Sequence, residues 1–155
     1  MAVRIQRSAF DVSKEISNFS TKLGASGAIV TFTGIVRNES GILDHIIIEH
    51  YPAMTESALK NFTEQTIVRF KLEDAFVIHR YGILKPTEII MMVATAAPHR
   101  QDAFAGAQFL MDCLKSRAPF WKKEVSGVKE EWVKARAKDE AELESWGHKF
   151  NQQIS

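Results

Sequence analysis

Cysteine is almost missing from this chain, which has one cysteine among 155 residues. A single cysteine, Cys113, excludes an intrachain disulfide framework and any cysteine-rich zinc site. It also fits a reducing compartment, so we expect a cytoplasmic protein. No low-complexity linker or internal repeat divides the chain, and we therefore expect one domain spanning residues 1–155.

Long apolar runs and an excess of either charge are also lacking. No apolar run approaches the roughly 20 residues that span a bilayer, and the N-terminus has no continuous apolar segment of the kind that targets a chain for export. Lys and Arg total 20 against 19 Asp and Glu, a net charge of +1. We therefore expect neither a membrane nor a nucleic-acid partner, and any cationic site must be local.

Familiar metal and nucleotide motifs are absent from the sequence. The histidines outside residue 99 show no metal-ligand spacing, and there is no glycine-rich phosphate loop or serine nucleophile elbow. We expect no bound metal and no cofactor. An RNA-binding module would need aromatic and basic side chains alternating on a sheet face, whereas the predicted strands are mostly aliphatic.

Hydrophobic periodicity predicts an α+β fold with a mixed or antiparallel sheet and helices packed on one side. Residues 27–37 read as a central strand with a possible bulge at Gly34, and residues 43–51 as its hairpin partner. The expected strands cover residues 3–5, 27–37, 43–51, 74–81, 88–97, 120–125 and 129–134, and the expected helices residues 12–23, 52–71, 98–117 and 139–150. The last two strands would form a small additional β subdomain.

The stretch from Leu114 to Glu124 is the strongest candidate in the chain for a functional site. Its helical pattern runs into Pro119, and aromatic and cationic side chains are interleaved around that break. Positive charge on a fixed backbone suits an anionic substrate. A solvated helix end is the alternative, because cations favour the last turn of a helix.

His99 and Arg100 stand at the start of the predicted helix that ends near Lys115. Backbone N–H groups and the helix dipole favour an anion there, and cations without a ligand would oppose that dipole. Arg100 and Lys115 lie on the order of 22 Å apart along such a helix, at a 1.5 Å rise per residue. One small ligand therefore reaches both ends only if they come from two copies of the chain in a symmetric dimer.

Lys122 can converge on Lys115 if the chain turns back at Pro119. A lysine beside another cation in a partly dry pocket should have a lowered pKa, which suits proton transfer or stabilisation of an oxyanion. Arg37, at a strand end, is either a functional side chain or a solvated rim arginine. Cys113 lies among apolar helix residues and reads as a small buried hydrophobe rather than a nucleophile.

Several ordered blocks carry a family resemblance. They are residues 27–38 (GAIVTFTGIVRN), 49–55 (EHYPAMT), 78–82 (IHRYG), 84–86 (LKP), 97–100 (APHR), 109–124 (FLMDCLKSRAPFWKKE) and 132–136 (WVKAR). With these blocks the chain resembles the large, catalytic subunit of molybdopterin synthase. Pro98, where a small or polar residue is common, and Ala53, where glycine is frequent, depart from the family pattern without removing a charged group.

The resemblance implies an α/β hammerhead fold and a homodimer that carries a small ubiquitin-like sulfur-carrier subunit at each end, a heterotetramer. It also implies a sulfurtransferase reaction, in which the carrier's C-terminal Gly-Gly thiocarboxylate supplies sulfur twice to cyclic pyranopterin monophosphate and forms the dithiolene of molybdopterin. Lys115 and Lys122 correspond to the family's active-site lysines. The substrate and anion contacts correspond to Arg37, His99, Arg100 and Arg136.

Two questions stay open from the sequence. Lys115 can act as proton donor, charge stabiliser or anchor for the carrier tail. The rival to an enzyme is a non-enzymatic ferredoxin-like module that binds an anionic metabolite or regulates a partner.

Overall fold

The computed structural model describes residues 1–133 and 137–154, with side chains described for 1–133 and 139–147. Eight strands form two four-stranded sheets, ordered β1-β4-β6-β2 and β5-β3-β7-β8. The elements are β1 (Ala2–Gln6), α1 (Val12–Ser20), β2 (Ala28–Ile35), β3 (His45–His50), α2 (Pro52–Phe70), β4 (Asp74–Arg80), β5 (Gly82–Leu84), β6 (Ile89–Ala97), α3 (Arg100–Arg117), β7 (Phe120–Ser126), β8 (Lys129–Trp132) and α4 (Ala137–Ile154). The expected α+β class is confirmed.

The main sheet is mixed, as predicted. β1 runs parallel to β4, whereas β4 and β2 both pair antiparallel with β6. β4 and β6 are buried along nearly their whole length, as their continuous apolar runs require. The β2–β6 register shifts between Gly34 and Ile35, so the predicted bulge is present.

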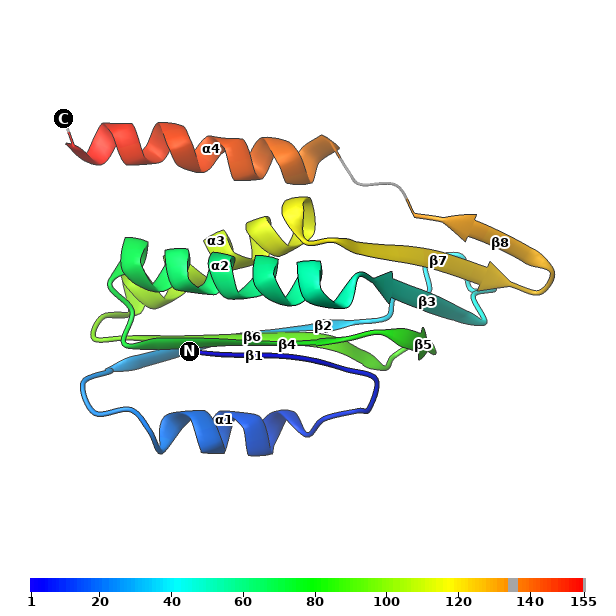
Figure 1. Ribbon diagram of the computed structural model, residues 1–155, viewed down its shortest axis with the longest axis horizontal. Coiled ribbons are helices and arrows are strands. Elements are labelled where there is room, and N and C mark those ends of the chain that lie inside the picture. The colour runs from blue at the N-terminus through cyan, green and yellow to red at the C-terminus, as the bar shows by residue number, and fades with distance from the viewer. Residues whose placement is uncertain (134–136, 155) are drawn as a thin grey trace.

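Helices cover both faces of the main sheet, which corrects the expectation that they pack on one side. Figure 1 shows α1 beneath the sheet and α2 and α3 above it. Phe19 of α1 packs with Ile78 and its neighbours on one face, while Leu59 of α2 packs with Val77 on the other. Because β4 and β6 are apolar on both sides, each side must be covered to exclude water.

The expected hairpin between residues 27–37 and 43–51 is wrong. β2 is an edge strand of the main sheet, and β3 pairs antiparallel with β5 and β7 in the second sheet. The end of β2 is held to the main sheet, where the Val36 N–H donates to the Glu88 carbonyl at 2.9 Å and the Thr87 N–H to the Val36 carbonyl at 2.9 Å. The chain therefore leaves the sheet before β3 begins.

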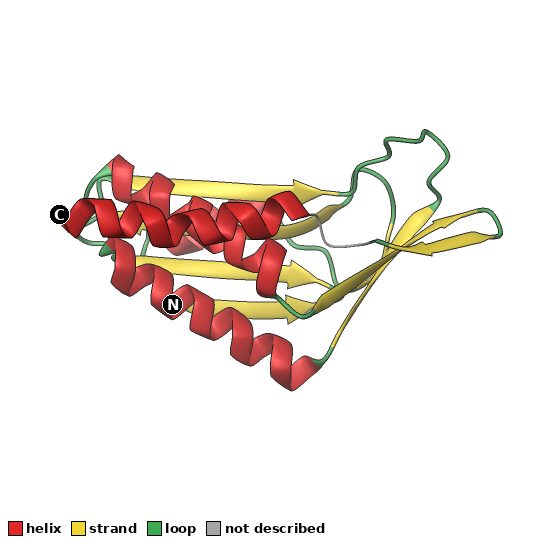
Figure 2. Cartoon of the chain, turned by 90° about the horizontal axis from the view of Figure 1, so that it is seen from above, coloured by secondary structure: helices red, strands yellow, loops and turns green. Residues whose placement is uncertain are grey.

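The second sheet extends as an arm beyond one end of the main sheet (Figure 2). Its outer hairpin, β7 with β8, matches the predicted small subdomain. Ile46, Ile48 and Leu84 bury the inner side of the arm against the core that α2 and α3 share. The described helices include none that is long and apolar enough to cross a membrane.

Candidate functional site

Lys115 and Lys122 lie on either side of the junction between α3 and β7. Lys115 is exposed in the last turn of α3, and the helix stops at Ala118, whose φ of −72° and ψ of 132° are extended. Proline restricts the residue before it to such a conformation. The Pro119 carbonyl accepts a hydrogen bond from the Thr55 hydroxyl of α2 at 3.3 Å, which ties the break in the chain to the first turn of that helix.

Strand alternation turns Lys122 inward. Side chains directly opposite one another on paired strands share a face, and Lys122 lies opposite the buried Ile48. Trp121 points the other way and meets the Tyr51 ring edge-on at 4.8 Å. Lys122 is half-buried on this inner face. Lys123 is also half-buried, but on the outer face, where its amine lies 3.2 Å from the Glu130 carboxylate.

Lys115 and Lys122 lie close enough for the charge of one to affect the pKa of the other. Burial, followed by the positive charge of Lys115, lowers the pKa of Lys122 from 10.5 to about 8, and the Asp139 carboxylate of α4 opposes this shift. The turn at Pro119, which the sequence permitted without requiring it, therefore brings both amines into one region. An amine that titrates near neutrality can exchange protons with a substrate.

Four rings from three strands and the residue before β5 contact one another near this lysine pair, and one pair of them is stacked. His79 of β4 lies parallel to Phe120 with ring centroids 3.8 Å apart, and His50 of β3 approaches Phe120 at 5.9 Å and Tyr81 at 4.5 Å. The Arg7 guanidinium lies 4.8 Å from the Tyr81 ring centre. We refer to Arg7, His50, His79, Tyr81 and Phe120 together as the ring stack.

Both histidines of the ring stack are held neutral. Burial lowers the pKa of His79 to about 3, against the effect of its hydrogen bond with the Arg80 carbonyl, and Lys122, His50 and Lys115 lower it further. Burial and then the charge of Arg7 lower the pKa of His50. The two histidines thus add no positive charge near the lysines at neutral pH, and Arg7 is the one cation of the ring stack.

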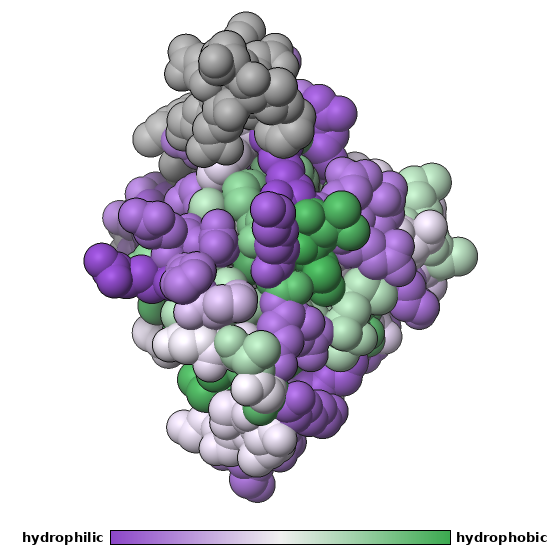
Figure 3. Space-filling view, turned by 90° about the vertical axis from the view of Figure 1, so that its left-hand side faces the viewer, coloured by the Kyte–Doolittle hydropathy of each residue, from purple (hydrophilic) through white to green (hydrophobic). Residues whose placement is uncertain are grey.

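His99 and Arg100 lie at the other end of α3, as the helix length required. With Gly27, Ala28, Pro98 and Gln101 they line a groove of about 430 Å³. Among the described residues, no side chain caps this helix N-terminus, so its backbone N–H groups remain available to an anion. Figure 3 views the end of the molecule where α3 begins, and hydrophilic side chains surround a smaller apolar area there.

Gly27 brings two backbone segments together at this groove. Its N–H donates to the Ala97 carbonyl at 3.0 Å, and a Cβ atom on residue 27 would lie 2.6 Å from the Pro98 carbonyl oxygen. Any larger residue would push apart the wall of the groove and the start of α3.

Of the two remaining predicted contacts, Arg37 and Arg136, the structure describes only Arg37. Arg37 follows the end of β2, where its exposed guanidinium pairs with Glu39 at 3.0 Å. Arg136 lies outside the described residues. Within this single chain, the structure therefore brings together Lys115 and Lys122, and separately His99 and Arg100.

Cys113 is buried within α3, as expected. Burial, then the neighbouring Asp112 carboxylate, raises the pKa of its thiol to about 11. A thiol that stays protonated is a poor nucleophile. No group of three or more His, Cys, Asp or Glu residues in the described part of the chain could hold a metal ion.

The last helix, α4, is docked over α2 and α3 beside the lysine pair. The Trp146 indole N–H donates to the Asp112 carboxylate at 2.6 Å, and its ring meets Phe109 edge-on at 5.7 Å. The Arg117 guanidinium pairs with Glu140 at 2.6 Å. These contacts hold the first turn of α4, and with it Asp139, near the end of α3.

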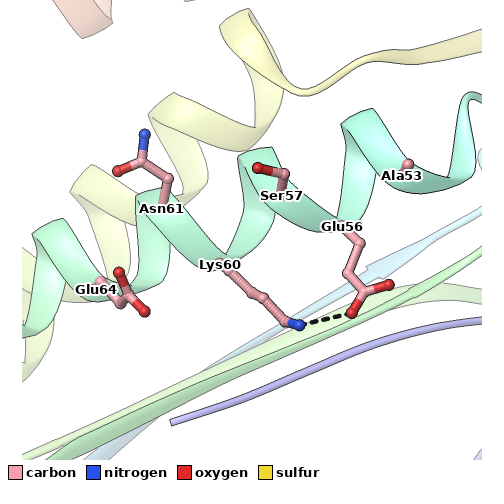
Figure 4. Close-up of a pocket in the computed structure, with 6 residues that line it drawn as sticks. All are labelled: Ala53, Glu56, Ser57, Lys60, Asn61 and Glu64. Atoms are coloured by element: carbon pink, nitrogen blue, oxygen red, sulfur yellow. Dashed lines mark ion pairs between the residues drawn. The ribbon is translucent and has the colours of Figure 1, made fainter.

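A second hollow, of about 580 Å³, lies along the outside of α2 (Figure 4). All of its lining residues come from that one helix, and its most visible interaction is the ion pair of Lys60 with Glu56 at 2.6 Å. Side chains from one helix face do not converge on a ligand. The candidate site therefore stays with the two cationic groups at the ends of α3.

Sequence reasoning found both cationic groups and missed the ring stack. The sequence patterns treated its histidines only as possible metal ligands, and Phe120 as the first residue of an expected strand. The single available signal was that His50, Tyr81 and Phe120 all fall within the blocks of family resemblance.

The sequence and the fold of this chain match those of a known protein family. The family model described as MoaE protein matches residues 5–117. The molybdopterin synthase catalytic subunit of Cereibacter sphaeroides is 54% identical over 146 residues, which make up 94% of this chain and 100% of that one. Among solved structures, the molybdopterin biosynthesis MoaE protein from Burkholderia ambifaria MC40-6 has a TM-score of 0.82 and 43% identity, covering 95% of this chain and 99% of that chain.

A more distant structure has the same fold. Molybdopterin synthase from Staphylococcus aureus has a TM-score of 0.77 and 26% identity, covering 84% of this chain and 96% of that chain. The sequence blocks, the fold and these relatives converge, and the chain belongs to the MoaE family, that of the catalytic subunit of molybdopterin synthase.

Proposed function

We propose that this chain is a sulfurtransferase. It takes sulfur from the C-terminal Gly-Gly thiocarboxylate of a small ubiquitin-like carrier subunit and transfers it twice to cyclic pyranopterin monophosphate. The observation that carries the proposal is the pairing of Lys115 with a half-buried Lys122, whose pKa is lowered to about 8. We expect this reaction to take place in the cytoplasm, where the carrier's thiocarboxylate and the thiol of Cys113 are both protected from oxidation.

The different surroundings of the two lysines suit them to different roles. Lys115 is exposed at the end of α3 and within reach of an arriving carrier tail. Lys122 lies deeper, and at neutral pH its lowered pKa allows it to donate a proton and recover it within a catalytic cycle. A thiocarboxylate brings its own sulfur nucleophile, so the large subunit needs no reactive cysteine, consistent with the raised pKa of Cys113.

The anionic phosphate of the substrate requires a second group of cations. We assign it to His99 and Arg100 at the N-terminus of α3, assisted by Arg37 and Arg136. α3 contains 18 residues and is therefore about 27 Å long, so the two ends of one helix cannot serve one small ligand. In a homodimer, the N-terminus of α3 from one copy would complete the lysine site of the other, giving two equivalent sites.

Reconstituted synthesis of molybdopterin tests the role of the lysines. The assay combines the purified chain, thiocarboxylated carrier and cyclic pyranopterin monophosphate, and compares Lys115→Ala with Lys123→Ala. Both variants remove one lysine close to the α3–β7 junction, but Lys123 faces outward toward Glu130 and Trp132. We expect Lys115→Ala to abolish sulfur transfer with its fold and dimer intact, and Lys123→Ala to retain it.

Near-normal turnover by Lys115→Ala would show that sulfur transfer does not need Lys115 and would refute its catalytic role. If the wild-type chain binds the carrier and the pyranopterin without forming product, the non-enzymatic binding module takes its place.

A further inference from the structure

The two lysines are carried by different parts of the fold. Lys115 belongs to α3, which packs on the main sheet, whereas Lys122 belongs to β7 in the second sheet. Figure 2 shows the second sheet as an arm that crosses the end of the main sheet. The separation of the two amines therefore depends on how the arm is fixed to the main sheet.

Phe120 stands at that junction. It lies two residues before Lys122, so both side chains point to the inner face of the arm. His79, from the main sheet, stacks on the Phe120 ring at 3.8 Å with an interplanar angle of 15°. His50, from the second sheet, lies directly opposite Phe120 in the β3–β7 register and contacts it from the arm side.

Each histidine contributes a ring face rather than a charge. The Nδ1 atom of His79 lies 2.8 Å from the Arg80 carbonyl oxygen, and because a carbonyl can only accept, this nitrogen carries the proton and the ring orientation is fixed. The Nδ1 atom of His50 is buried without a hydrogen-bond partner among the described residues. Hydrogen bonds fix the backbone around Phe120, through the β3–β7 pairing and the Thr55 hydroxyl at Pro119. The Phe120 side chain is held between the two sheets by ring packing.

We infer that His79 and Phe120 are positioning residues that set the distance between Lys122 and Lys115. The inference rests on the function proposed for the two lysines, but it assigns neither ring a contact with the substrate. Moving β7 by a fraction of its own width would separate the amines and open Lys122 to water. Misplacement of a catalytic group by about 1 Å is enough to lower a rate by about 100-fold.

A measurement of the Lys122 pKa tests the inference only if the charged and titratable groups that face Lys122 stay unchanged. They are Lys115 from α3, Asp139 from α4 and His79 from the ring stack. None of these three is changed in Phe120→Leu, which replaces the ring with a smaller apolar side chain. A change in the titration of Lys122 in that variant therefore reports a change in its position or its burial.

The test compares Phe120→Leu with Phe62→Leu, its matched control. Phe62 of α2 is likewise half-buried against the core cluster that Phe120 contacts, but it is outside the ring stack. The first readout is the pKa of Lys122, followed by NMR of lysine side-chain amines and assigned with Lys122→Arg. The second readout is kcat and KM for the carrier in the sulfur-transfer assay.

For Phe120→Leu we expect the Lys122 pKa to rise from about 8 toward 10.5. The kcat should fall by about 10–100-fold, with KM for the carrier within about threefold of the wild-type value. Phe62→Leu should leave the pKa and the kcat unchanged. A folded Phe120→Leu protein with a Lys122 pKa of about 8 and wild-type kcat would overturn the inference.

A second pair of variants supplies the test if Phe120→Leu fails to fold. His79→Phe keeps a flat ring against Phe120 and should stay near wild type, whereas His79→Leu should raise the Lys122 pKa. Equal pKa values for Lys122 in these two variants would also overturn the inference. If Phe120→Leu raises the pKa while Lys115→Ala remains fully active, the proposed function fails and the positioning role stands.

Discussion

Replacing Lys122 with methionine should make the protein more stable while removing its activity. Methionine has a similar length and an apolar body, so it fills the half-buried position beside Ile48 without an amine to desolvate. Burial and the charge of Lys115 disfavour the protonated form of Lys122 in the folded chain. Methionine removes both penalties.

The magnitude follows from the pKa of Lys122. It falls from 10.5 to about 8 on folding. One pKa unit corresponds to about 1.4 kcal/mol, so below pH 8 the folded state bears a penalty of up to about 3 kcal/mol. Because part of the side chain is hydrated, we expect Lys122→Met to gain about 1–3 kcal/mol at pH 7.

The sign of the pH dependence makes this prediction specific. Between pH 8 and 10.5 the unfolded chain keeps a proton on Lys122 that the folded chain has lost, so the stability of the wild type rises with pH in that window. The advantage of Lys122→Met should therefore be largest at pH 7 and shrink toward pH 10.

Urea denaturation of both proteins at pH 7 and pH 10 measures this difference, since every other titrating group is common to both. Lys123→Met, on the outer face of β7, is the control and should change stability little at either pH. Destabilisation by Lys122→Met at pH 7, or an advantage that does not depend on pH, would refute the reasoning.

Two further predictions concern single positions. Cys113→Ser should keep its sulfur-transfer activity, because the buried thiol has a pKa of about 11 and takes no part in the chemistry; complete loss of turnover with an unchanged unfolding transition would instead show that the Cys113 thiol is needed for the reaction. Gly27→Ala should weaken substrate binding, because its Cβ atom would lie 2.6 Å from the Pro98 carbonyl oxygen beside the anion groove. We expect KM for cyclic pyranopterin monophosphate to rise about tenfold, whereas Gly24→Ala, which has room for the methyl group, should not change it.

The helices and most strands could be predicted because local signals define them. Asp11 accepts the Lys14 N–H at 3.2 Å and begins α1, and Pro52 begins α2. Strand partners were harder to predict. The apolar, β-branched run of β2 suggested a central strand, yet it lies at the edge of the main sheet, because local sequence does not encode which strand will lie beside it.

The candidate site, like the fold, could be predicted only in part from the sequence. Helix length separates Arg100 from Lys115 in any α-helical chain, so the sequence alone predicts that both ends can serve one small ligand only across two copies of the chain. The ring stack could not be predicted from the sequence, because His50, His79 and Phe120 come from three strands in two sheets. Only the folded chain shows that an aromatic residue next to the lysines is held by two neutral histidines.

Mixing two inactive variants tests the central claim, that one site is built from the opposite ends of α3 in two copies of the chain. Lys115→Ala and Arg100→Ala chains are combined, subunit exchange is confirmed by mass spectrometry of differently labelled chains, and sulfur transfer is measured with thiocarboxylated carrier. Each variant alone should be inactive, and the mixed dimer should regain one complete site of its two. No recovery of activity in a fully exchanged mixture would contradict the shared site.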